Sequence, residues 1–142
     1  MTEIDQKCEE IENPFAGAPV IFSYSRAQAI EDGILVDVTE TAKEAGFKTP
    51  VAITIGVYGE LVRTPAIAAE RGESDSGRLW DVVWMCACAA RKLHRNHETD
   101  TAYFQVLATG DDGKRKLHQL WSKCGPGDAG EPVVTIMLIG ED

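Results

Sequence analysis

The feature that most constrains the fold is a long amphipathic segment, GRLWDVVWMCACAARKLHR, at residues 77–95. Its apolar residues recur at spacings of three and four, which is the repeat of an α-helix with one buried side. Ser74, Asp75 and Ser76 offer capping groups and negative charge where such a helix would start. The pattern therefore predicts a long central helix with a buried stripe. The stripe consists of Leu79, Val82, Val83, Cys86, Ala89, Ala90 and Leu93.

The same segment holds cysteines and histidines that suggest a metal site, namely Cys86, Cys88, His94 and His97. Each helical residue turns by about 100°, so Cys86 and Cys88 point about 160° apart. Cys86 and His97 are also separated by about 16 Å along the helix axis. A zinc ion needs its ligands within about 2.0–2.3 Å of itself. We therefore expect no metal here, and thiols that pack as small apolar side chains.

Short elements are predicted before this helix. The apolar segment VIFSYS, at residues 20–25, is typical of a strand. SRAQAIEDG, at residues 25–33, is typical of a short helix, because Ser23 or Ser25 can cap its start and Gly33 can end it in a left-handed conformation.

A second strand is predicted at residues 34–38, followed by a short helix that Thr39 caps and Gly46 ends. The sequence PVAIT, at residues 50–54, could be a strand. Apolar residues at helical spacing from about 54 to 62 compete with that interpretation, and both alternatives stay open.

The last third of the chain is predicted to be β. Residues 101–110 and 114–124 flank the sequence GDDG, whose Asp-Gly pair favours a hairpin, and residues 131–138 form a third strand. Residues 63–77 are interpreted as a polar connection that contains glycine and serine. The order of elements predicts an α+β fold, with short N-terminal strands and helices and one long central helix packed on a C-terminal antiparallel sheet, a β-meander.

Size and charge exclude some classes of function. The chain has 142 residues and a net charge of −9, so nonspecific binding to a nucleic-acid backbone is not expected. No apolar run is long enough to span a membrane, and the acidic start does not resemble a signal peptide. We expect a cytoplasmic protein with no cofactor, built as an acidic lead-in at residues 1–19 and a single domain at 20–142.

Four residues are candidates for a binding site. Trp80 and Trp84 lie four residues apart on the predicted helix, beside its apolar stripe, where they either fill the core or mark a partner interface. Arg26 lies at the start of the first predicted helix, and Glu131 stands at the start of a buried strand. No spacing supports a catalytic triad, so we assign no catalytic residue.

Four segments together resemble a bacterial domain-of-unknown-function family of small proteins that are often carried on plasmids, phages and integrative elements. They are VIFSYSRAQAIEDGILVDVTETAKEAGF (20–47), PVAIT (50–54), SGRLWDVVWM (76–85) and GPGDAGEPVVTIMLIGED (125–142). The segments TIGVYGELV and CACAARKLHRNH depart from the family pattern. The resemblance implies an accessory gene of a mobile element and carries over no catalytic residue.

These observations lead to one expectation and two alternatives. We expect a protein that binds another protein, for example one with a basic surface, as an anti-defence factor of the anti-CRISPR or nucleic-acid-mimicking kind would. The first alternative is an enzyme with a layout that resembles ADP-ribosyltransferases, in which Tyr24, Arg26 and Glu131 would share a cleft. The second is a structural domain of a larger assembly.

Overall fold

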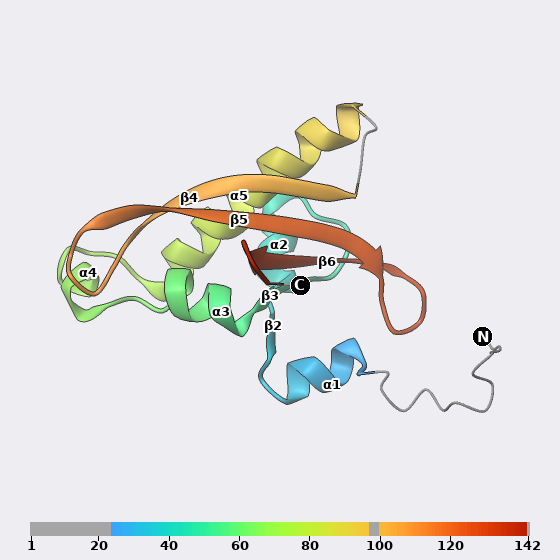
Figure 1. Ribbon diagram of the computed structural model, residues 1–142, viewed down its shortest axis with the longest axis horizontal. Coiled ribbons are helices and arrows are strands. Elements are labelled where there is room, and N and C mark those ends of the chain that lie inside the picture. Colours follow the sequence, from blue (N-terminus) through green and yellow to red (C-terminus); the bar gives the residue numbers. More distant parts are fainter. Residues whose placement is uncertain (1–23, 97–99, 142) are drawn as a thin grey trace.

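The computed structural model describes residues 24–96 and 100–141, and for 93–96 the backbone alone. The chain forms an α+β domain in which helices pack against a five-stranded mixed sheet of order β2-β3-β6-β5-β4 (Figure 1). The predicted fold class is confirmed. The strands are β2 (Leu35–Asp37), β3 (Val51–Thr54), β4 (Thr101–Thr109), β5 (Arg115–Pro126) and β6 (Pro132–Leu138).

The C-terminal strands form the expected meander. β4 pairs antiparallel with β5, and β5 pairs antiparallel with β6. β3 then joins the other side of β6 in parallel, and β2 pairs antiparallel with β3. The sheet is therefore mixed, and β4 is one of its edge strands. The Asp-Gly turn ends in Gly113, whose φ of 80° is the left-handed conformation that glycine adopts without strain.

The predicted central helix is α5 (Asp75–Asn96), which lies across one face of the sheet and packs against β4 (Figure 1). Val82, Val83 and Cys86 are completely buried, which confirms the centre of the predicted stripe. The strands of the sheet contribute alternate residues to the same buried core. They include Val51, Ile53, Phe104, Val106, Leu120 and Ile136.

The elements between residues 25 and 46 follow the predictions with one exception. In α1 (Arg26–Glu31), the Ser25 hydroxyl accepts the Gln28 N–H, as expected of a helix cap. The exception is α2 (Thr39–Ala45), in which Thr39 is the first helical residue and not the cap. Its hydroxyl and its N–H both donate to the Asp37 carboxylate, so the hydroxyl bonds to a residue before α2 and does not cap the helix. The predicted strand at 20–25 lies mostly outside the described residues.

Both interpretations of residues 50–62 are correct, one after the other. β3 ends at Thr54, whose hydroxyl caps α3 (Ile55–Val57), and a π-helical turn, η1 (Tyr58–Val62), follows directly. The prediction for residues 63–77 misses one element, because this connection contains α4 (Ala66–Glu70). Pro65 precedes α4 with the extended backbone that suits a helix start.

A buried arginine joins the start of α5 to the rest of the core. Arg78 is 5% exposed, and its guanidinium donates to the carbonyls of Leu61 and Thr109 and pairs with Glu73 at 2.9 Å. The Thr109 hydroxyl donates to Glu73 as well, and this bond, together with Arg78, holds the pKa of Glu73 below its usual value. Within the described residues, no helix is both long and apolar enough to cross a membrane.

Candidate functional site

Arg26 is held within the fold. Its guanidinium donates to the Thr135 hydroxyl at 2.7 Å and to the Val134 carbonyl at 2.8 Å, which fastens α1 to β6. The carboxylate of Asp128, in the turn after β5, accepts the N–H groups of Arg26 and Ala27. These two bonds hold the pKa of Asp128 below its usual value. Arg26 therefore acts as a structural anchor in this arrangement.

Glu131 and Tyr24 are also engaged locally. Glu131 is exposed, and its carboxylate turns back over its own loop to accept the Ala129 N–H at 2.9 Å. The Tyr24 hydroxyl donates to Asp32. Two hollows on the described part of the chain, one beside β4 and one beside Arg78, are lined by none of Tyr24, Arg26 and Glu131. The enzyme alternative therefore gains no support from these residues.

The two tryptophans of α5 divide between the core and the surface. Their rings stack with centroids 5.7 Å apart. Trp80 is half-buried against the core, whereas Trp84 is 40% exposed. The guanidinium of Arg91 lies 5.1 Å from the centre of the Trp84 ring and donates to the Ala45 carbonyl at 2.8 Å. This cation–π contact and hydrogen bond hold Trp84 in place at the surface.

The cysteines of α5 point to different sides, as the helical geometry predicts. Cys86 is buried and Cys88 is exposed. Burial raises the pKa of the Cys86 thiol to about 11, so it is an unreactive core residue at neutral pH. The prediction about the histidines lies outside the part of the chain whose side chains are described.

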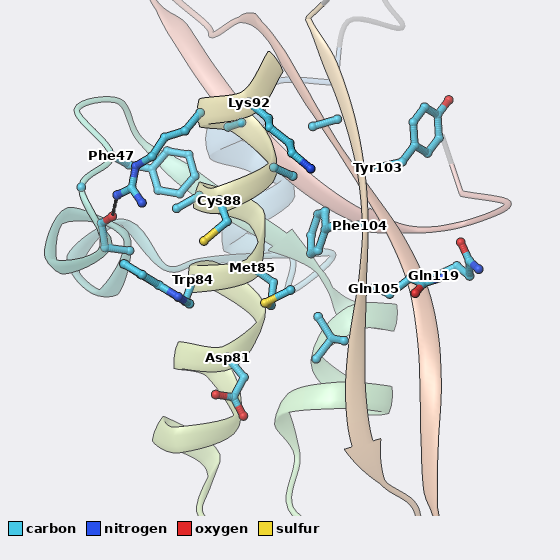
Figure 2. Close-up of a pocket in the computed structure, with 18 of the residues that line it drawn as sticks. Phe47, Asp81, Trp84, Met85, Cys88, Lys92, Tyr103, Phe104, Gln105 and Gln119 are labelled. Atoms are coloured by element: carbon cyan, nitrogen blue, oxygen red, sulfur yellow. Dashed lines mark hydrogen bonds between the residues drawn. The ribbon is translucent and has the colours of Figure 1, made fainter. Parts of the chain in front are cut away.

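A broad hollow extends over the exposed side of α5 and around the edge strand β4 (Figure 2). Its volume is about 2070 Å³, and it is open to solvent. α5 contributes Asp81, Trp84, Met85, Cys88 and Lys92, and Phe47, which follows the C-terminal end of α2, also lines the hollow. Met85 is 41% exposed, so large apolar side chains remain accessible here.

The other side of the β4–β5 hairpin carries an apolar surface that we call the outer patch. Three cross-strand pairs form it, because Tyr103 faces Trp121, Gln105 faces Gln119 and Leu107 faces Leu117. Figure 2 shows Tyr103, Gln105 and Gln119 pointing away from α5, while Phe104 points towards it. The exposed fractions are 68% for Tyr103, 48% for Leu107 and 58% for Leu117.

Sequence reasoning missed the outer patch. The only signal is that both alternating sets of residues in β4 contain large apolar side chains, Phe104 in one set and Tyr103 and Leu107 in the other. A strand with one solvent-exposed face normally has polar residues at alternate positions. Exposed apolar residues that gather in one place mark interaction surfaces more often than scattered ones do.

The fold and this surface together define a small α+β domain with accessible apolar side chains on both sides of an open sheet edge. The chain belongs to DUF6573, a family of unknown function, whose family model matches residues 11–142. No curated protein and no solved structure gives a significant match to the chain.

Proposed function

We propose that the protein acts by binding another protein, and that the outer patch with the neighbouring edge of β4 is its contact surface. The observation that carries this proposal is the exposure of Tyr103, Leu107 and Leu117 on one face of the hairpin. Aromatic and apolar residues in such a cluster supply most of the free energy of a protein interface when a partner covers them.

The charge of the hairpin sets it apart from the rest of the molecule. Residues 101–126 carry four basic and two acidic side chains, whereas the whole chain has a net charge of −9. The side chains of the outer patch carry no charge, and Arg115 and Lys123 flank it on β5. A partner that covers this face therefore meets apolar and basic groups. The basic partner surface expected from the net charge would have to contact other, acidic parts of the chain.

An anti-defence role would be one instance of this binding function. It rests on the resemblance to mobile-element proteins and requires that the bound protein belong to a host defence system. The same surface would serve equally in a structural assembly, where the partner is a permanent neighbour. The identity of the captured protein separates these two roles.

Site-specific photocrosslinking tests the binding proposal. A benzophenone amino acid is placed at Tyr103 in one variant and at Lys43, an exposed position on α2, in a control. Both are expressed in cells of the organism that carries the gene and irradiated. We expect a discrete cross-linked species from position 103 that is absent from position 43 and is reduced at least about tenfold by Leu117→Glu, because a buried charge disrupts an apolar contact.

The proposal fails if both positions give the same products, since that indicates random collisions. It also fails if position 103 yields only a cross-linked dimer of the chain, because the face would then join two copies and not a different protein. Circular dichroism of the Leu117→Glu variant must match the unaltered protein, so that loss of cross-linking reports the surface and not unfolding.

A further inference from the structure

The free edge of β4 presents backbone groups that are ready to pair with another strand. The Asp100 carbonyl accepts the Cys124 N–H, and the Lys114 carbonyl accepts the Gly110 N–H, so even-numbered residues of β4 bond to β5. The N–H and C=O groups of Tyr103, Gln105 and Leu107 therefore point away from β5. Within the described residues, none of these groups has a hydrogen-bond partner.

At the Thr109 end of this edge, the backbone carbonyl already has a hydrogen-bond partner. The Thr109 carbonyl accepts Arg78, so pairing of the free edge stops there. The available stretch thus centres on Tyr103, Gln105 and Leu107. An added strand of about five to seven residues matches that length, because its residues pair one to one with those of β4.

A strand added to the β4 edge would have side chains on both faces of the sheet, and each face offers groups for them to contact. Side chains of successive strand residues point to opposite faces, so one set would lie beside Tyr103 and Leu107 on the outer patch. The other set would lie on the side of α5, where Met85 is exposed and Lys92 extends from the helix towards β4 (Figure 2). The hollow around β4 is the space such a strand would occupy.

The charges around the hollow determine what such a strand must carry. Its described lining has four basic side chains and one acidic one in a chain where acids outnumber bases by 23 to 14. These are Lys48, Arg91, Lys92, Arg115 and Asp81. Lys48 and Lys92 have no ion-pair partner within the described residues. Acidic side chains on the incoming strand would complement them.

The geometry points to a specific mode of recognition, which rests on the proposed function: the partner contributes an extended segment, with acidic side chains among apolar ones, that adds to the free edge of β4 as a sixth strand. Backbone pairing with Tyr103, Gln105 and Leu107 supplies general affinity. Apolar contacts and the Lys48 and Lys92 charges select the sequence.

The first test uses two libraries of nine-residue peptides in which Val, Ile, Leu or Thr alternate with charged residues. The charged residues are Asp or Glu in one library and Lys or Arg in the other. The full-length protein is immobilised and both libraries are applied at equal concentration. We expect retention of peptides from the acidic library, enriched at least about tenfold over the basic one.

A selected peptide is then tested for strand addition by N-methylation. One version is methylated at odd-numbered residues and the other at even-numbered ones. In a strand only alternate N–H groups face the neighbouring strand, so one version should lose binding while the other keeps most of it. A peptide that binds the outer patch by its side chains alone would respond equally to both versions, and that result overturns the inference.

Charge reversal tests the basic groups. Lys48→Glu with Lys92→Glu should weaken binding of the selected peptide about tenfold or more, because two attractions become repulsions. The matched control, Lys43→Glu with Lys114→Glu, changes the net charge equally at exposed sites outside the hollow. The control should retain affinity within about twofold, and equal losses in both variants overturn the selection by charge.

Two further outcomes overturn the inference, and the first of them leaves the proposed function intact. One is that no peptide from either library is retained, although position 103 still cross-links to a partner. The other is that sedimentation shows a dimer of the protein that Gln105→Pro disrupts, because a second β4 would then occupy the edge. Gln105→Pro removes one free N–H from that edge, and its circular dichroism must match that of the unaltered protein.

Discussion

The two faces of the β4–β5 hairpin are built from the same strands and differ in what covers them. The inner face buries Phe104, Val106 and Leu120 beneath α5. The outer face leaves Tyr103 and Leu117 largely exposed, although their side chains are of similar size and polarity. The comparison shows that apolar character alone does not decide burial. A helix with its own apolar stripe covers the inner face, whereas Tyr103 and Leu117 on the outer face stay exposed.

The largest effect expected from this comparison is on stability. Leu120→Ala removes a completely buried side chain beneath α5 and should lower the free energy of unfolding by about 2–5 kcal/mol. Leu117→Ala, on the same strand but the opposite face, should change it by no more than about 0.5 kcal/mol. Urea denaturation followed by circular dichroism measures both.

These two variants form a matched pair, because the residue type, the strand and the substitution are the same. A loss of more than 2 kcal/mol in both would mean that the outer face is also packed in the isolated protein. The contrast between a core face and a binding face would then be lost, together with the main support for the proposed contact surface.

The next effect separates the two sides of α5 by the reactivity of its thiols. The pKa of Cys86, at about 11, lies two units above its ordinary value of 9.0, so at neutral pH its thiolate fraction falls about a hundredfold. Modification of Cys86 by N-ethylmaleimide should therefore be much slower than that of the exposed Cys88, because burial both lowers the thiolate fraction of Cys86 and blocks access to it. Samples are taken over time and digested, and mass spectrometry of the peptides then gives the modified fraction of each cysteine.

In urea above the unfolding transition, both thiols should react at similar rates. Raising the pH should speed the reaction of native Cys86 up to about pH 11, because the thiolate is the reactive form. Equal rates for Cys86 and Cys88 in the native protein at neutral pH would contradict the placement of Cys86 in the core.

Local signals in the sequence predicted much of this fold. The period of α5, the capping Ser25 and the turn that ends in Gly113 each act within a few residues, so each could be read directly. The prediction that Thr39 caps α2 is wrong because Asp37, two residues earlier, accepts its hydroxyl. α4 was missed because five residues give too short a periodic pattern.

Long-range contacts could not be predicted in the same way. Arg26 pairs with residues more than 100 positions away, and no local pattern shows that its guanidinium is used inside the fold. The parallel pairing of β3 with β6 is similarly remote in sequence. Of the candidate residues, Trp84 does lie in the hollow beside β4, whereas Trp80 packs against the core. The choice between them depends on which side of α5 meets the sheet.

The smallest effect concerns the outer patch itself. The rings of Tyr103 and Trp121 stack across the strands with centroids 6.4 Å apart. Tyr103→Thr keeps a residue that favours strands and removes the stack, so it should lower the free energy of unfolding by about 0.5–1 kcal/mol. Gln105→Thr, on the same face without an aromatic partner, serves as the control and should change stability less. Urea denaturation of both variants measures the difference.

This last measurement separates packing from binding at one residue. If Tyr103 serves only to stiffen the hairpin, Tyr103→Thr should bind a selected peptide with nearly unchanged affinity. The small loss of stability has a negligible effect on binding as long as the protein stays folded. If Tyr103 contacts the partner, the affinity should fall at least about tenfold while the protein remains fully folded. An unchanged affinity with the expected stability loss would assign the aromatic pair to the hairpin alone and confine the contact surface to the β4 edge and the exposed side of α5.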